Sequence, residues 1–175
     1  MTLAVIPARS GSKRLPNKNF REFLGYPLFR WTIDQVRICG CIDDFVLTTD
    51  REEIQSTKIV LRPPMLATDK ASLVDTVIHA VWEYNRRHNI IPDLIVLLQP
   101  TGVARTREMI STCIRKKHCY TATNGKPNGG VYVVPWKVLE KTRQFGGKPI
   151  ERPCIDIDTL KDFKKAEEAV RGKPF

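Results

Sequence analysis

The sequence predicts an α/β protein in which helices cover both faces of a mostly parallel sheet. Short apolar runs alternate with longer amphipathic segments along the chain, which is typical of strand–helix–strand units. The run at 93–98 is apolar at nearly every position, as expected of a central parallel strand that is buried on both faces. The chain has 175 residues, and this length predicts one globular domain over 1–175.

The individual elements follow from local patterns in chain order. Strands are expected at 3–7, 45–49, 58–61, 93–98, 130–134 and 154–157, and helices at 28–38, 72–87, 107–116, 136–142 and 160–170. The helix over 72–87 has the clearest pattern, because apolar residues recur at helical spacing after Ser72 and Asp75 follows three residues later. The glycine-containing segment 146–149 is expected to form a surface loop.

The composition excludes several classes of protein. With 42% hydrophobic and 27% charged residues, the chain is not a disordered tail, a collagen-like repeat or a small disulfide scaffold. No run approaches the roughly 18 apolar residues that a membrane span requires, and the N-terminus lacks the basic start of a signal peptide, so we expect a cytoplasmic protein. The five cysteines lack CxxC spacing, which favours reduced thiols over a zinc site.

The charge balance indicates an anionic partner. Lys and Arg number 29 against 19 Asp and Glu, which gives a formal net charge of +10. Such an excess favours nucleic acid, an anionic membrane surface or a small phosphorylated substrate. No RNA-recognition, helix-turn-helix or aromatic–basic strand motif accompanies the charge, so a nucleic-acid partner is supported by the charge alone.

The segment after the first expected strand gathers cations, hydroxyls and a glycine into one turn. Arg9, Lys13, Arg14 and Lys18 all fall between residues 8 and 19. In open parallel sheets, ligands bind beyond the carboxyl ends of strands, where backbone N–H groups and basic side chains can hold phosphates. The spacing is not that of a Walker loop. A phosphate site is therefore one interpretation, and a solvated basic loop is the other.

A pair of aspartates near the end of the chain is a candidate metal site. Alternation along a strand would place Asp156 and Asp158 on one face and turn Ile157 to the other. Two carboxylates that lie close together suit Mg²⁺, which usually keeps waters and shares the phosphates of a substrate. A solvated strand end or a helix N-cap is the alternative interpretation of the same residues.

Six short motifs follow one another along the chain. They are residues 4–13 with Pro16, Lys18 and Asn19; Thr48-Thr49-Asp50; 61–63 with 66–72; Leu97-Leu98-Gln99-Pro100-Thr101; 128–132; and 155–159 with Asp162 and Ala166-Glu167. In this order they resemble the signature motifs of the acylneuraminate cytidylyltransferases (CMP-sialic acid synthetases) and the related CMP-Kdo synthetases. The resemblance covers residue 4 to about residue 168, nearly the whole chain.

The resemblance implies a Rossmann-like, three-layer α/β/α nucleotidyltransferase fold and a defined reaction. CMP would pass from CTP to the anomeric hydroxyl of a nonulosonic, sialic-type or Kdo-type sugar acid, with release of pyrophosphate and with Mg²⁺ as cofactor. The implied catalytic residues are Arg9, Lys13, Lys18, Asp156 and Asp158, and the two aspartates would also bind the metal. The implied nucleotide-binding residues are Ala8, Arg9, Ser12, Lys13, Lys18, Asn19, Arg62, Ala71 and Ser72. The implied sugar-binding residues are Gln99, Pro100, Thr101 and Asn128.

The sequence departs from the family pattern on the sugar side. After Gln-Pro-Thr it continues as Gly102-Val103-Ala104-Arg105, where the family has Ser-Pro-Leu-Arg, and Lys126 stands in place of an Arg. The family's long dimerisation arm is essentially missing between Thr101 and Asn128. One hypothesis is a compact, active CMP-sugar synthetase, and the other is a degenerate CTP-binding protein without transferase activity. A homodimer is compatible with the resemblance although its usual arm is missing, and the sequence does not identify the acceptor sugar.

Overall fold

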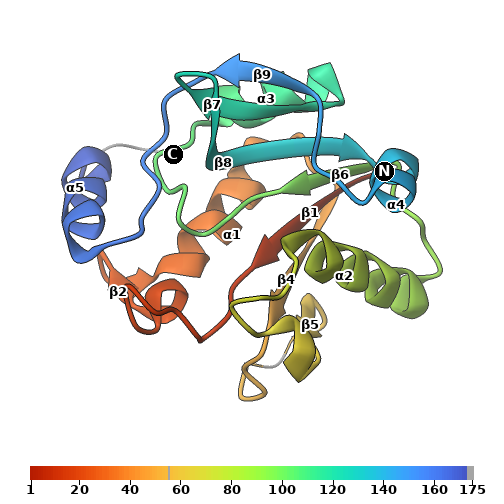
Figure 1. Cartoon of the computed structure of the whole chain (residues 1–175), viewed down its shortest axis with the longest axis horizontal. Helices are drawn as coiled ribbons and strands as arrows, with labels where there is room; N and C mark the ends of the chain where they lie inside the picture. Colours follow the sequence, from red (N-terminus) through yellow and green to blue (C-terminus); the bar gives the residue numbers. More distant parts are fainter. Residues whose placement is uncertain (55, 173–175) are drawn as a thin grey trace.

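A mixed sheet forms the centre of the molecule, as a computed structural model that describes residues 1–54 and 56–172 shows (Figure 1). Within these residues the sheet has seven strands in the order β5-β4-β1-β6-β8-β7-β9. The strands are β1 (Thr2–Pro7), β4 (Asp44–Thr49), β5 (Ile59–Leu61), β6 (Leu94–Leu97), β7 (Cys119–Thr123), β8 (Lys126–Pro135) and β9 (Lys148–Glu151). β5, β4, β1 and β6 are parallel neighbours, β8 runs antiparallel to β6 and β7, and β9 is parallel to β7. The prediction of a mostly parallel sheet is confirmed.

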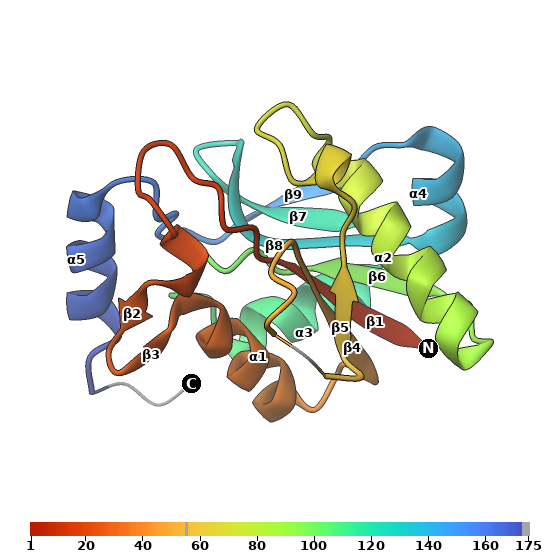
Figure 2. The ribbon, with the colours of Figure 1, turned by 90° about the horizontal axis from the view of Figure 1, so that it is seen from below.

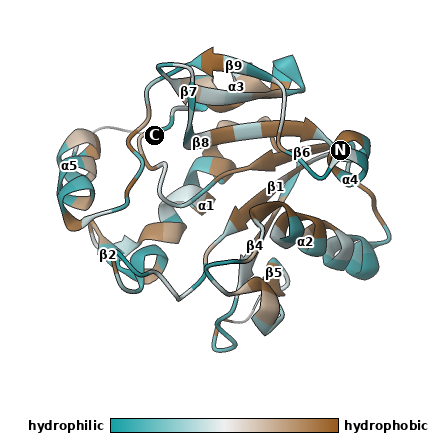
Figure 3. Ribbon diagram, viewed as in Figure 1, coloured by the Kyte–Doolittle hydropathy of each residue, from teal (hydrophilic) through white to brown (hydrophobic). Residues whose placement is uncertain are grey.

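Helices cover both faces of this sheet. They are α1 (Leu28–Cys39), α2 (Leu73–His88), α3 (Arg107–Lys116), α4 (Trp136–Thr142) and α5 (Leu160–Val170). Along β1, Leu3 and Val5 pack in a core shared with α2 and α4, while Ala4 and Ile6 pack in a core shared with α1 and α3. Because both faces of the central strands are covered, their sequences are apolar throughout, and Figure 3 shows hydrophobic residues concentrated on β1, β6 and β8.

A third core lies at one end of the sheet, beneath α5 (Figures 1 and 2). Here α5 packs on the small antiparallel sheet of β2 (Glu22–Phe23) and β3 (Tyr26–Pro27), with the rings of Phe23 and Phe163 5.2 Å apart in an edge-to-face arrangement. Leu15 and Ile157 belong to the same buried cluster. This core therefore holds the segment before α5 against the loop that follows β1.

The helix predictions are confirmed to within about two residues, and three of them coincide with the observed helices, α3, α4 and α5. Polar N-caps fix the starts of α2 and α3, since Ser72 accepts a hydrogen bond from the backbone N–H of Asp75 at 3.3 Å and Thr106 accepts one from that of Met109 at 3.2 Å. In contrast, α1 and α4 begin after Pro27 and Pro135, without a side-chain cap. None of the described helices is long and apolar enough to cross a membrane.

The strand predictions for the last third of the chain need correction. Residues 154–157 are not a strand, because the segment forms one backbone hydrogen bond, Ile157 N to Thr101 O at 3.3 Å, rather than a ladder. The expected loop at 146–149 instead leads into β9, where Gly147 at φ 105° lets the chain approach β7 so closely that a Cβ would overlap the carbonyl of His118.

The sequence reasoning also missed β7 and the hairpin that joins it to β8. Asn124 and Gly125 form the two-residue turn, both with positive φ, 52° and 73°. The Glu151 carboxylate accepts hydrogen bonds from their two backbone N–H groups at 3.1 and 2.7 Å. An Asn-Gly pair between residues that can form strands is a known hairpin signal and would have revealed this turn.

The start of α5 gives a test of the third core. Thr159 Oγ1 accepts a hydrogen bond from Asp162 N at 3.2 Å, and the Asp162 carboxylate accepts one from Thr159 N at 2.8 Å. Thr159→Ala removes half of this capping box and should lower the free energy of unfolding by about 1 kcal/mol. Urea denaturation followed by circular dichroism measures the loss, with the exposed Lys161→Ala in the same helical turn as control. Equal midpoints for the two variants would show that the cap does not stabilise the protein.

Candidate active site

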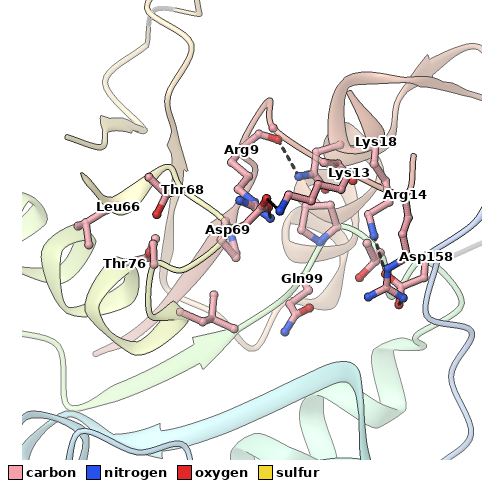
Figure 4. A pocket seen from close by; sticks show the side chains of 18 of the residues that line it. Arg9, Lys13, Arg14, Lys18, Leu66, Thr68, Asp69, Thr76, Gln99 and Asp158 are labelled. Carbon is pink, nitrogen blue, oxygen red and sulfur yellow. Dashed lines mark hydrogen bonds and ion pairs between the residues drawn. The ribbon is translucent and has the colours of Figure 1, made fainter. Parts of the chain in front are cut away.

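A cavity of about 470 Å³ opens at the carboxyl ends of β1 and β6 (Figure 4). These two strands are neighbours in the sheet, but the chain leaves β1 toward β4 on the opposite side. Such a switch in strand order leaves a crevice between the loops, which is where ligands bind in open α/β sheets. The lining residues are Pro7, Arg9, Gly11, Ser12, Lys13, Arg14, Lys18, Asn19, Arg62, Leu66, Thr68, Asp69, Ala71, Leu73, Thr76, Gln99, Pro100, Thr101, Asp156 and Asp158.

On one wall, two cations of the loop after β1 share a carboxylate. Arg9 Nη2 lies 2.6 Å from Asp69 Oδ1, and Lys13 Nζ lies 3.0 Å from Asp69 Oδ2. Hydrogen bonds from Lys13 and then from Arg9 lower the pKa of Asp69, so the carboxylate is ionised at neutral pH. Asp69 thus holds both cations at the cavity.

On the opposite wall, the other two cations of the loop share a second carboxylate. Arg14 Nη1 lies 2.8 Å from Asp158 Oδ2, and Lys18 Nζ lies 3.0 Å from Asp158 Oδ1. Lys18 also donates to the carbonyl of Ile157 at 2.5 Å, and its side chain is only 13% exposed. Figure 4 shows Arg9, Lys13 and Asp69 together near the middle of the view, and Arg14 and Asp158 together to their right.

The loop itself is fixed from β4. The backbone N–H and hydroxyl of Ser10 donate to the Asp50 carboxylate at 2.8 and 2.5 Å. Partial burial raises the pKa of Asp50, but the two hydrogen bonds from Ser10 outweigh this effect and leave the pKa below its usual value. Asn19 adds a third tie, because its side-chain amide donates to the Arg9 carbonyl at 3.0 Å. The cations therefore project from a backbone held in one conformation.

Arg62 enters the cavity from the segment between β5 and α2. Arg62 is 6% exposed, and its guanidinium donates through Nη2 to the Thr48 carbonyl at 2.6 Å and through Nη1 to the Leu66 carbonyl at 3.5 Å. Burial, assisted by the charge of Arg9 and opposed by Asp50, lowers the pKa of Arg62 to about 10, so it stays charged at neutral pH. Its Nε has no hydrogen-bond partner within the described chain, which leaves one donor for a ligand.

The remaining wall combines the loop after β6 with the segment before α5. Thr101 is 7% exposed, and its hydroxyl has no hydrogen-bond partner among residues 1–54 and 56–172. Asp156 and Asp158 both line the cavity, whereas Ile157 is fully buried beneath α5. The expected placement of both carboxylates on one side is therefore observed, although the segment is not a strand.

The Asp156–Asp158 pair is the candidate metal site. In the part of the chain that the structure describes, no group of three or more His, Cys, Asp or Glu side chains could hold a metal ion. Two carboxylates beside a cavity fit Mg²⁺, which needs few protein ligands when substrate phosphates and waters complete its octahedron. They do not fit a structural zinc site, which takes four protein ligands, mostly Cys and His.

Twelve of the fifteen predicted site residues line the cavity, and Ala8, Ser72 and Asn128 do not. Ala8 is fully buried in the core of α1 and α3, and Ser72 caps α2. The amide of Asn128 is used within the sheet: it accepts from Thr121 Oγ1 of β7 at 2.7 Å and donates to the carbonyl of Arg152, just after β9, at 2.8 Å. With a side chain 7% exposed, Asn128 has no free group toward the cavity.

Several lining residues were not among the predicted site residues, and Asp69 is the most informative of them. It lies within the motif at 66–72, so the motif located it without showing its role. Arg14, which the sequence groups with the other cations of the basic loop, also lines the cavity. Thr76 follows Leu73 by three residues and therefore faces the same side of α2. Helical spacing would have identified it once Leu73 was placed at the cavity.

Solved structures with the same architecture define the class. The chain superposes on CMP:2-keto-3-deoxy-manno-octonic acid synthetase complexed with CTP with a TM-score of 0.77 over 99% of both chains, at 14% sequence identity. At this identity the likeness shows the fold, which is that of the nucleotidyltransferases.

The sequence comparisons place the chain within this class. The family model described as cytidylyltransferase matches residues 3–110, so the chain belongs to the cytidylyltransferase family. It is 38% identical over 115 residues to CMP-N,N'-diacetyllegionaminic acid synthase of Legionella pneumophila, a match that covers 62% of this chain and 49% of that protein. It is 35% identical over 173 residues to N-acylneuraminate cytidylyltransferase of Escherichia coli, which covers 92% of this chain and 36% of that protein. The chain thus spans about half or less of these relatives, and the family resemblance drawn from the motifs is confirmed.

Proposed function

We propose that this chain transfers CMP from CTP to the anomeric hydroxyl of a nonulosonic, sialic-type sugar acid and releases pyrophosphate. The observation that carries the proposal is the cavity in which a four-cation loop faces the Asp156–Asp158 pair across the carboxyl ends of β1 and β6. In this reaction the hydroxyl oxygen bonds to the α-phosphorus of CTP as the bond to the bridging oxygen of the β-phosphate breaks. The hydroxyl proton passes to solvent, and pyrophosphate carries away the bonding electrons.

The loop after β1 would neutralise the triphosphate. Arg9 and Lys13 lie on one wall and Lys18 on the other, so phosphate oxygens between them would meet cations from both sides. Exchange of the Asp69 and Asp158 carboxylates for phosphate oxygens keeps these cations paired. Stabilising charge with groups already in position is the main catalytic task in phosphoryl and nucleotidyl transfer.

The nucleoside would lie toward Arg62, Ala71 and Asn19, which all line the cavity. The Nε–H of Arg62 is a buried, charged donor without a partner within the described chain. A ligand acceptor that paired with it would gain a strong hydrogen bond, whereas a ligand without an acceptor there would leave the donor unsatisfied. The acceptor would lie toward Gln99, Pro100 and Thr101, where the free hydroxyl of Thr101 offers a hydrogen bond.

Asp156 and Asp158 would hold a divalent cation, Mg²⁺ in our proposal. When bound, such an ion neutralises phosphate oxygens and lowers the pKa of the attacking hydroxyl. Asp158 is paired with Arg14 and Lys18. Phosphate oxygens of CTP would pair with these two cations instead, which would leave the Asp158 carboxylate available to hold the metal.

Pyrophosphate release tests the proposal. The purified chain is incubated with CTP, Mg²⁺ and a panel of acceptors that includes neuraminic, legionaminic, pseudaminic and Kdo-type acids, with neutral hexoses as controls. We expect release with at least one sugar acid and none with the hexoses. CTP binding without turnover on any acceptor would instead support a degenerate CTP-binding protein. The single-domain extent over 1–175 and a homodimer stay predictions, which light scattering and limited proteolysis can check.

A further inference from the structure

The loop that follows β6 is held by a buried arginine of its own. Arg105 is 3% exposed, and its Nε donates to the Gly102 carbonyl at 2.7 Å while its Nη2 donates to the Gln99 carbonyl. Burial lowers the pKa of Arg105 to about 10, and Cys154 and then the Asp156 carboxylate oppose this shift, so the guanidinium stays charged at neutral pH. One guanidinium therefore fixes both ends of the turn that carries Gln99, Pro100 and Thr101.

A second buried side chain holds the other carbonyls of the same loop. Gln35 of α1, which is 4% exposed, donates through Nε2 to the carbonyls of Val103 and Arg105 at 2.8 and 3.1 Å. Neither Val103 nor Arg105 lines the cavity, whereas Gln99 does. The two side chains thus perform the same task at opposite ends of one loop, but only Arg105 acts on the part that faces the cavity.

The Gln99–Gly102 turn also supports the segment that carries the aspartate pair. Ile157 N donates to the Thr101 carbonyl at 3.3 Å, between the two aspartates in sequence. Gly102 packs so closely on β8 that a Cβ would lie 3.0 Å from the Gly129 carbonyl. Gly129 itself, at φ 71°, would bring a Cβ within 3.3 Å of the Asp156 carboxyl carbon. A shift of the Gln99–Gly102 turn would therefore move the segment that carries Asp156 and Asp158.

We propose that Arg105 is a positioning residue for the nucleotidyl transfer, and this inference rests on the proposed function. Its forked guanidinium fixes the Gln99–Gly102 turn and, through Thr101 and Ile157, the position of the aspartate pair opposite the cation loop. The planar fork of arginine can bind two carbonyls in one geometry, whereas a lysine ammonium is a point charge that cannot. The shape of the side chain, not its charge alone, carries the role.

The test compares two Arg105 variants with a matched change at Gln35. Arg105→Lys keeps the charge, Arg105→Met keeps the apolar stem, and Gln35→Met removes the anchor of the two carbonyls away from the cavity. Both Arg105 variants should lower kcat about 100-fold with the KM for CTP nearly unchanged, since misplacement by about 1 Å can reduce turnover by this factor. Gln35→Met should lower Tm by a similar amount and leave kcat close to that of the wild type.

Two results would overturn the inference: wild-type kcat in Arg105→Lys, or an equal loss of kcat in Gln35→Met at a matched loss of Tm. A wild-type chain without turnover would contradict the proposed function, and the amide NMR spectrum then decides the positioning role. Arg105→Lys should shift the signals of Thr101, Gly102 and Ile157, and Gln35→Met should leave that of Ile157 in place. An unmoved Ile157 signal in Arg105→Lys would contradict the link between turn and aspartates.

Discussion

Asp158→Asn is expected to lower kcat about 1,000-fold without unfolding the protein. The change removes one of two carboxylates at the cavity, and a catalytic divalent ion contributes several kcal/mol of transition-state stabilisation, at about 1.4 kcal/mol for each factor of ten. The same change frees Arg14 and Lys18 from their shared partner. Without divalent metal, CTP should therefore bind more tightly to the variant than to the wild type, as isothermal titration calorimetry in EDTA would show.

Asp162→Asn is the matched control for this prediction. Asp162 lies four residues further on, and its carboxylate caps α5 and does not line the cavity. The control should lose up to about 1 kcal/mol of stability and keep its kcat. If Asp158→Asn retained its turnover, or if Asp162→Asn lost as much, the assignment of the aspartate pair to the metal would be wrong.

Arg62→Met should raise the Kd for CTP about 100-fold. Hydrogen bonds to charged groups contribute about 1.5–3 kcal/mol, and the buried Nε–H of Arg62 has no hydrogen-bond partner within the described chain. The variant also loses the charged hydrogen bond from Arg62 to the Thr48 carbonyl, which keeps the Ala8 N–H as a partner at 2.9 Å, so its stability should fall by about 1.5–3 kcal/mol. Kd is therefore measured by calorimetry well below the Tm of the variant.

Arg87→Met supplies the control for Arg62. Arg87 also donates to a backbone carbonyl, that of Ile59 in β5, but it lies outside the cavity at β1 and β6. Its replacement should leave the Kd for CTP unchanged. Equal weakening by both variants would indicate a general effect of positive charge, and unchanged binding in Arg62→Met would remove Arg62 from the nucleotide site.

Residue patterns predicted the helix bounds, because these depend on interactions between residues that are close in sequence. The bounds of α3 and α5 follow from apolar spacing and from caps at Thr106 and Thr159, which act within one helical turn. Residues 154–157 show the limit, since a short apolar–polar alternation forms a strand only where a neighbouring strand offers a free edge. The approach of β9 to β7 depends on a backbone conformation at Gly147 that no period in the sequence reports.

The candidate site shows the same division. Motif order located the cation loop and the aspartates, because residues after β1 and before α5 meet at one end of the sheet. It gave no sign that Asp69 pairs with Arg9 and Lys13, since that contact joins segments about sixty residues apart. Nor could it show that β7 and the residue after β9 use both ends of the Asn128 amide, which depends on how β7, β8 and β9 pair.

Because carboxylates already pair with the cations of the loop, an anion that binds in the cavity must take the place of a carboxylate. Asp69 and Asp158 each already hold two cations, so an incoming anion gains only what it offers beyond a carboxylate. A small monovalent anion replaces one partner with an equivalent one and gains little. A triphosphate presents several linked charges to both walls at once, and the second exchange follows the first at high effective concentration. We therefore expect the pairing of these cations with Asp69 and Asp158 to favour polyphosphates over small monovalent anions.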